Sequence, residues 1–125
     1  MINAKKLYST LLQDNRITAL ISENNILNSY PNKVVDFPCL IFVDENQADT
    51  EYYENQPGAS NCNLMIHIFS KKLDGYVTTS EVAIVIAEIL HENLWNCPQN
   101  REVSDPDPDV EHRIMFFNKS IFLEN

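Results

Sequence analysis

The chain has 125 residues, of which only 2 are glycine, and its 18 acidic residues against 9 basic ones give a formal net charge of −9. Dinucleotide-binding turns, P-loops and the GxSxG turn of hydrolases need several glycines within a few residues, so the distant pair Gly58 and Gly75 excludes all of them. The acidic balance repels polyanions, which predicts no specific binding to nucleic acid and no membrane partner.

Length and composition predict a single globular domain over residues 1–125. The chain is 44% hydrophobic and 22% charged, and a chain of this size commonly folds around one core. The sequence has no run of about 18 apolar residues and no uninterrupted apolar stretch near its start, so we expect neither a membrane span nor a signal peptide. Cys39, Cys62 and Cys97 are odd in number and widely spaced, which indicates reduced thiols in a cytosolic setting.

Two helices are predicted at the amino terminus. After a capping residue at Asn3, apolar residues recur at three- and four-residue spacing through 4–13, which indicates an amphipathic helix. A shorter helix is expected over 16–23, and it ends at the pair Asn24-Asn25, where a left-handed residue is tolerated.

Two strands follow, separated by an acidic segment. The apolar run 37–43 predicts a strand buried on both faces, and the alternating run 62–70 is the clearest strand in the chain. Between them, 44–60 is acidic and contains residues that favour extended backbone, so we interpret it as a long, poorly covered hairpin arm. Tyr52 and Tyr53 lie inside this polar segment and are more typical of contact residues than of core residues.

The strongest helix is predicted over 78–96. Thr78 and Glu81 have the spacing of a capping box, and apolar residues then recur at three- and four-residue intervals. The run stops at 96–98, where a proline occurs.

The carboxy-terminal part is predicted as a second acidic loop over 99–110 and a final strand over 111–123. The alternation of this strand is disturbed at Asn118, which predicts a β-bulge there. The order of elements and the tight connection between the first two strands favour an α+β fold. We expect a small, mostly antiparallel sheet of about four strands with about two to three helices packed on one face.

Histidine and cysteine positions predict no catalytic, cofactor-binding or metal-binding residues. His67, His91 and His112 lack the close spacings by which one element presents two ligands to a metal. The thiols of Cys39 and Cys62 lie in apolar strands, where a buried thiol is normally inert.

One aspartate run imitates a calcium loop. Asp105, Asp107 and Asp109 match its first half, but Val110 and Phe116 stand where the glycine and the bidentate glutamate are needed. A solvated loop is the better interpretation. A carboxylate pair for acid–base chemistry stays open in a chain with 18 acids.

The two acidic segments are therefore the predicted partner interface. The contact residues that we expect are Asp49, Glu51, Tyr52, Tyr53, Glu54, Asp105, Asp107 and Asp109.

Several pieces of the sequence together match a known family. They are the helical region Leu7 to Ile21, Tyr30-Pro31, the run Phe37-Pro38-Cys39-Leu40-Ile41-Phe42, the strand end Ile66-His67-Ile68-Phe69-Ser70, the capped helix from Ser80 to Leu94, and an aromatic-rich final strand after a polar loop. This arrangement spans nearly the whole chain and resembles the tail-completion (tail-terminator) proteins of bacteriophages with long tails.

The resemblance implies a structural protein of the virion, not an enzyme, with no cofactor. Proteins of this kind assemble, usually as a hexameric ring, on the finished end of a tail tube and present a surface to the head. The implied partners are the tail tube protein, the head–tail connector or stopper protein, and further copies of the chain.

The resemblance also implies assembly in the host cytoplasm, a final place at the head–tail interface, and DNA that passes through the ring lumen. The alternative is a soluble acidic binding module or adaptor, and a small enzyme with a carboxylate site is a weaker one.

Overall fold

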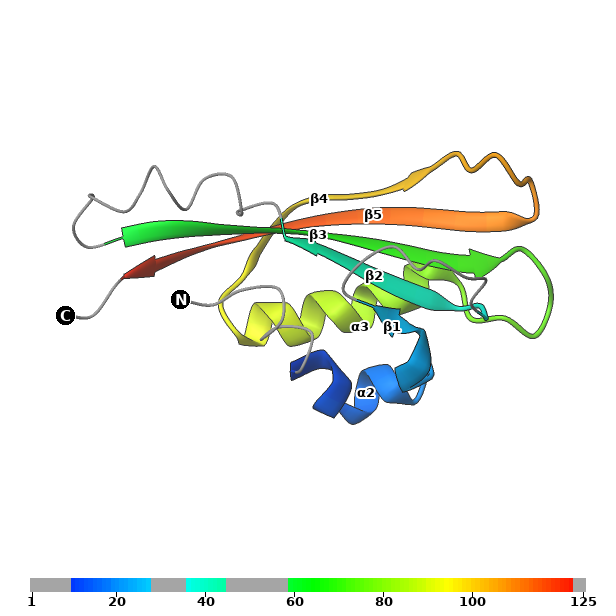
Figure 1. The fold of residues 1–125 in the computed structure, drawn as a ribbon, viewed down its shortest axis with the longest axis horizontal. Helices are drawn as coiled ribbons and strands as arrows, with labels where there is room; N and C mark the ends of the chain where they lie inside the picture. The colour runs from blue at the N-terminus through cyan, green and yellow to red at the C-terminus, as the bar shows by residue number, and fades with distance from the viewer. Residues whose placement is uncertain (1–9, 28–35, 45–58, 123–125) are drawn as a thin grey trace.

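The computed structural model describes residues 10–27, 36–44 and 59–122 (Figure 1). In chain order the elements are a helical turn at 10–13, α2 (Asn15–Thr18), the 3-10 helix η1 (Glu23–Asn25), β1 (Ile26–Leu27), β2 (Cys39–Asp44), β3 (Ala59–Lys71), α3 (Thr79–Glu92), β4 (Asn96–Val103) and β5 (Val110–Phe122).

The strands form one 5-stranded sheet in the order β1-β2-β3-β5-β4. β2 and β3 pair antiparallel, as the predicted hairpin requires, and only β1 pairs parallel with its neighbour. The predicted α+β fold with a mostly antiparallel sheet is confirmed. Two strands differ from the prediction: β1, which is very short, and β4, whose residues the sequence places in a helix end and a loop.

β3 and β5 form the long central ladder of the sheet. Their pairing runs without interruption from Ala59↔Phe122 to Lys71↔Val110. The irregularity in register lies instead in β4, between Asn96 and Gln99. The irregularity predicted at Asn118 is therefore in the other strand: β4 carries one extra residue opposite β5, in the stretch that contains Pro98, which cannot donate to the ladder.

The described helices lie on one face of the sheet, with α3 running along it (Figure 1). The buried apolar side chains between the layers include Leu40, Phe42, Leu64, Ile66, Ile68, Val82, Ile86, Ile89, Leu90, Met115 and Phe117. In β2 the alternate residues Cys39 and Ile41 are also buried, which confirms the prediction of a strand buried on both faces.

The N-terminus of α3 has the predicted capping box. The Thr78 hydroxyl accepts a hydrogen bond from the Glu81 backbone N–H, and the Glu81 carboxylate accepts one from the Thr78 N–H. A second carboxylate, from Glu111 of β5, accepts from the Thr79 N–H at 2.8 Å. Carboxylates at this position satisfy free backbone donors and interact favourably with the helix dipole.

The C-terminus of α3 lies earlier than the predicted 96. Asn93 is the C-cap, and Leu94 adopts a left-handed conformation with φ 67°. The Leu94 N–H donates to the His91 carbonyl at 3.0 Å and the Trp95 N–H to the Leu90 carbonyl at 2.9 Å. This is a Schellman motif, which ends a helix by turning its last carbonyls back onto the following residues.

The second predicted helix, 16–23, is also shorter in the structure. α2 ends at Thr18, and η1 then leads directly into β1, so the chain must turn toward the sheet within a few residues. The first predicted helix is helical at 10–13, and its earlier residues lie outside the described part of the chain.

Candidate interaction surfaces

Residues 45–58, most of the first acidic segment, lie outside the described residues. The predicted contacts that fall there are Asp49, Glu51, Tyr52, Tyr53 and Glu54. Their role stays a prediction. The structure does describe the two strand ends that the segment connects, Asp44 of β2 and Ala59 of β3.

The second acidic segment forms the acidic loop, residues 105–109, between β4 and β5. The Asp107 N–H donates to the Asp105 carboxylate and the Asp109 N–H donates to the Asp107 carboxylate, both at 2.9 Å. The Lys72 N–H donates to the Asp109 carbonyl at 2.9 Å, which ties the loop to the chain after β3. Asp107 and Asp109 are exposed, and Asp105 is half-buried. The loop thus presents carboxylates to solvent on a backbone held by its own side chains.

The strand ends that the two acidic segments connect lie far apart. Ala59 begins β3 beside the end of β5, whereas the acidic loop joins β4 to β5 beside the end of β3 at Lys71 (Figure 1). A strand of 13 residues is about 40 Å long at about 3.3 Å per residue. The β3–β5 ladder therefore has two separate ends: one carries the acidic loop, and β3 begins at the other with Ala59.

A second surface is the 71–76 turn, which connects β3 to α3. Leu73 is 55% exposed and Tyr76 is 39% exposed. Gly75 has φ 93°, a conformation that glycine adopts without steric cost. The Lys71 Nζ lies 5.9 Å from the Tyr76 ring centroid, and Lys72 is exposed. The turn therefore combines two exposed large apolar side chains with two positive charges and the negative charge of the exposed Asp74.

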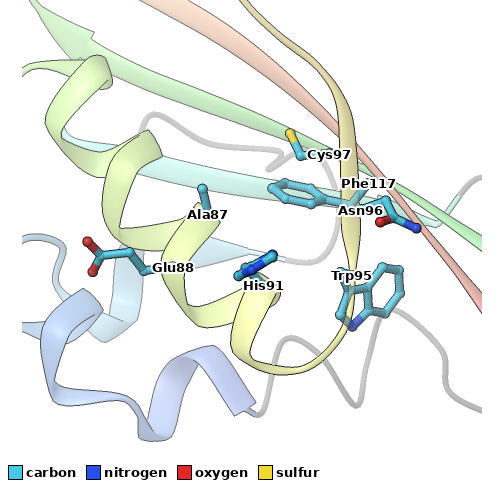
Figure 2. Close-up of a pocket in the computed structure, with 7 residues that line it drawn as sticks. All are labelled: Ala87, Glu88, His91, Trp95, Asn96, Cys97 and Phe117. Atoms are coloured by element: carbon cyan, nitrogen blue, oxygen red, sulfur yellow. The ribbon is translucent and has the colours of Figure 1, made fainter.

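A pocket of about 380 Å³ lies at the other end of α3 (Figure 2). It is lined by Ala87, Glu88 and His91 from the helix, by Trp95, and by the first two residues of β4, Asn96 and Cys97. Phe117 of β5 lies between the helix and this chain. The lining is mostly apolar, and the carboxylate of Glu88 points away from the other lining side chains (Figure 2).

Exposed apolar side chains flank this α3 pocket. Leu94 is 78% exposed and Ile84, one turn before the pocket on α3, is 58% exposed. Ile84, Glu88 and His91 follow one another at helical spacing, so they lie along one side of α3. Apart from these two, the only large apolar residues exposed in the described part of the chain are Leu73 and Tyr76 of the 71–76 turn.

A histidine pair lies on the face of the sheet opposite α3. His67 Nδ1 and His112 Nε2 are 3.0 Å apart, and the His112 ring stacks on Phe69 with centroids 4.1 Å apart. Burial lowers the pKa of both imidazoles, the charge of His112 further lowers the pKa of His67, and Asp105 partly offsets the effect on His112. The lowered pKa values favour neutral rings, and protonation of both rings would remove the hydrogen bond because it needs one unprotonated nitrogen.

The thiols and carboxylates of the described residues do not gather into a reactive centre. Burial raises the pKa of the Cys39 thiol to about 11 and raises that of Cys97. Within 10–27, 36–44 and 59–122, no three metal-ligating side chains converge. None of the described helices has the length and apolar content to cross a membrane.

Sequence reasoning missed three of these features. The histidine pair can be predicted only when the register of β3 and β5 is known, because that register places His112 beside Phe69 on the same face of the sheet. The α3 pocket forms because α3 ends early, at Leu94, and β4 starts just after it. The sequence predicts neither boundary. The exposed apolar residues of α3 have nearly the same spacing as its buried apolar residues, so the sequence pattern does not distinguish the two sets. Leu94 could have been distinguished, because it shortly precedes an Asn-Cys-Pro break.

Comparisons with known proteins agree with this architecture. A sequence model of the family described as "Tail completion protein gp17" matches residues 5–123. Among solved structures, a chain of the "Virion of native gene transfer agent (GTA) particle" superposes with a TM-score of 0.61. The two sequences are 9% identical over 93% of this chain and 91% of that chain, so the likeness concerns the fold. No curated protein gives a significant match.

Proposed function

The chain belongs to the tail completion protein gp17 family, and from this premise we propose that it is a virion structural protein that caps the end of a tail tube as a ring. In this role it stops tube growth and forms the surface that joins the tail to the head connector. The observation that carries the proposal is the family match, which covers residues 5–123.

The physical basis is the open end of a tube. Rings stacked by head-to-tail contacts never close, so the last ring always exposes an unsatisfied surface. A subunit that fits this surface on one side and differs on the other stops growth by occupying it. This mechanism needs no catalytic residue and no cofactor.

The shape of the sheet supports a subunit with two different ends. The acidic loop lies at one end of the β3–β5 ladder, and β3 begins at the opposite end with Ala59, to which the other acidic stretch leads in the sequence. We propose that one end contacts the tail tube protein and the other the head–tail connector. Separate ends about 40 Å apart let both partners bind the same ring without competing.

The negative charge of the chain supports the proposal that DNA passes through the ring without binding to it specifically. Each copy in a ring contributes a charge of −9. Carboxylates that face the lumen repel the phosphates of DNA. We propose that Asp105, Asp107 and Asp109, with the carboxylates of the first acidic segment, supply this charge.

Deleting the gene from the phage or prophage that carries it tests the proposal. We expect filled heads without tails, together with tails of irregular length that fail to join. Adding the purified protein to such a lysate should restore joined particles. Normal joining in the deletion strain would contradict the proposal and would favour a soluble acidic adaptor.

A further inference from the structure

We propose that the 71–76 turn, with the acidic loop beside it, is the docking surface for a basic partner protein that presents an apolar side chain ringed by lysine and arginine. This inference rests on the proposed function, in which each end of the β3–β5 ladder contacts a different component of the virion. At one of these ends it names the contact residues and the chemistry of the partner.

Leu73 and Tyr76 form the apolar part of this surface, and both are exposed on one short turn. In the described ranges only two other large apolar side chains are exposed, Ile84 and Leu94, and they lie on α3 and just after it. Neighbouring exposed apolar residues with a polar rim mark protein interaction sites, and tyrosine is enriched among the residues that dominate binding energy. The turn therefore has the composition of a contact surface.

Hydrogen bonds near both ends of the turn fix its position. Near its start, the Lys72 N–H donates to the Asp109 carbonyl at 2.9 Å, which joins the turn to the acidic loop. Just after it, the Val77 carbonyl accepts a hydrogen bond of 2.6 Å from the hydroxyl of Ser70, which is fully buried. A surface that is ordered before binding loses little conformational entropy when the partner binds.

The Lys71 ammonium group helps to hold Tyr76 in place. The Lys71 Nζ lies 5.9 Å from the centroid of the Tyr76 ring and 5.6 Å from that of the Phe37 ring. A cation at such a distance over an aromatic face is attracted to it. Because Lys71 is half-buried beside these rings, the exposed lysine of the turn is Lys72.

The exposed charges around the two apolar side chains are mostly negative. Four carboxylates are exposed at this end of the sheet, those of Asp36, which precedes Phe37, of Asp74 on the turn, and of Asp107 and Asp109 in the acidic loop. Against them the turn exposes one lysine. A negative potential attracts a basic partner and favours one orientation of approach. A second copy of the chain, with a net charge of −9, is repelled instead.

The apolar and the charged residues have different effects in such a contact. Ion pairs at the rim of an interface mainly change the association rate and its salt dependence, whereas buried apolar anchors supply most of the affinity. The same carboxylates repel phosphates, so a basic protein bound at this end is compatible with DNA that passes beside it.

Cosedimentation of the chain with purified tail tubes and, separately, with tail-less heads of the same phage tests the apolar contact. Leu73→Ser and Tyr76→Ser should each lower the affinity for one of these particles by about tenfold or more and leave the affinity for the other unchanged. Ile84→Ser, at an exposed apolar residue of α3, is the matched control and should change neither. Unchanged affinities in the turn variants, or equal losses for both particles, would overturn the inference.

Salt dependence tests the chemistry of the partner. Association of the parent with its particle should slow as the NaCl concentration is raised, because salt screens the attraction. Asp74→Asn combined with Asp107→Asn should slow association at low salt and flatten this dependence. Glu23→Gln combined with Glu88→Gln removes two charges at other exposed positions and should have little effect. A rate that rises with salt, or does not respond to it, contradicts a basic partner.

A short peptide of alternating lysine and leucine probes the surface without any virion component. In NMR titrations of the full chain it should shift the backbone amide signals of 71–76 and 105–109, and a matching peptide of glutamate and leucine should not. Shifts centred elsewhere, or equal shifts with both peptides, refute the docking surface even if the chain caps tubes. A chain that binds the lysine peptide at the turn but binds neither tail tubes nor heads supports the surface and contradicts the proposed function.

Discussion

His67 and His112 share a hydrogen bond of 3.0 Å across β3 and β5, on the face of the sheet that α3 does not cover. Neither residue is close to the other in the sequence, and neither lines the α3 pocket. Their pairing gives the sheet a titratable contact that responds to mildly acidic pH.

Stability should fall as the pH drops below about 6.5, the ordinary pKa of histidine. Burial lowers the pKa of both imidazoles in the folded protein, so between the folded and unfolded values the unfolded state binds more protons. The contribution of the pair to the unfolding free energy is therefore constant above that window and decreases by at most about 1.4 kcal/mol per pH unit per histidine inside it.

Urea unfolding between pH 8 and pH 5 measures this effect. His112→Gln keeps a hydrogen-bonding side chain but removes one titrating group, so its pH dependence should be shallower than that of the parent. The interpretation fails if the two curves run parallel.

The capping box should be the main local stabiliser of the α3 N-terminus. Thr78→Ala removes the acceptor of the Glu81 N–H and is expected to lower the unfolding free energy by about 1 kcal/mol. Ser80→Ala, two positions later and exposed, is the matched control and should have little effect. Equal losses in the two variants, measured by thermal or chemical unfolding, would show that the cap contributes nothing specific.

Substitutions at Leu94 measure the free-energy cost of its left-handed backbone. Leu94→Gly relieves the left-handed backbone and, after the entropy of glycine in the unfolded chain is subtracted, should raise the unfolding free energy by about 0.5–1 kcal/mol. Leu94→Ala removes the side chain but keeps the strain, so it should not gain stability.

Urea unfolding of both variants measures the difference. A glycine variant no more stable than the parent would contradict strain at Leu94.

The acidic loop should influence DNA passage through its charge. Replacing Asp105, Asp107 and Asp109 by asparagine keeps the side-chain oxygens that accept the loop hydrogen bonds and removes three charges. We expect slower DNA ejection from particles that carry this variant, because the lumen repels phosphates less.

The matched control removes the same number of charges elsewhere on the described surface. It combines Glu23→Gln, Asp36→Asn and Glu102→Gln, all at exposed positions. Slowed ejection by both variants to the same extent would point to net charge and not to the loop.

Much of the fold could be predicted because its signals are local. The capping box of α3, the alternation in β3 and the apolar run of β2 each depend on residues close in sequence, and each appears in the structure. β4 could not be predicted in the same way, since nearly all of its side chains are exposed and it has no apolar alternation. Pairing with β5 holds it in place, and that pairing depends on tertiary structure.

The interaction surfaces were less predictable than the fold. Composition alone indicates the acidic loop, and the structure shows how it is held. In the sequence, a glycine indicates the 71–76 turn, but nothing indicates that the apolar residues of this turn are exposed. The α3 pocket arises where a helix ends early and an edge strand begins, so it depends on three elements that only the fold brings together.

Electron microscopy of tail tubes polymerised with and without the purified chain shows directly whether the chain caps a tube. Tube capping predicts that tubes grown with the chain stop at shorter, more uniform lengths and carry one added ring at one end. Bare tubes of unchanged length would contradict it.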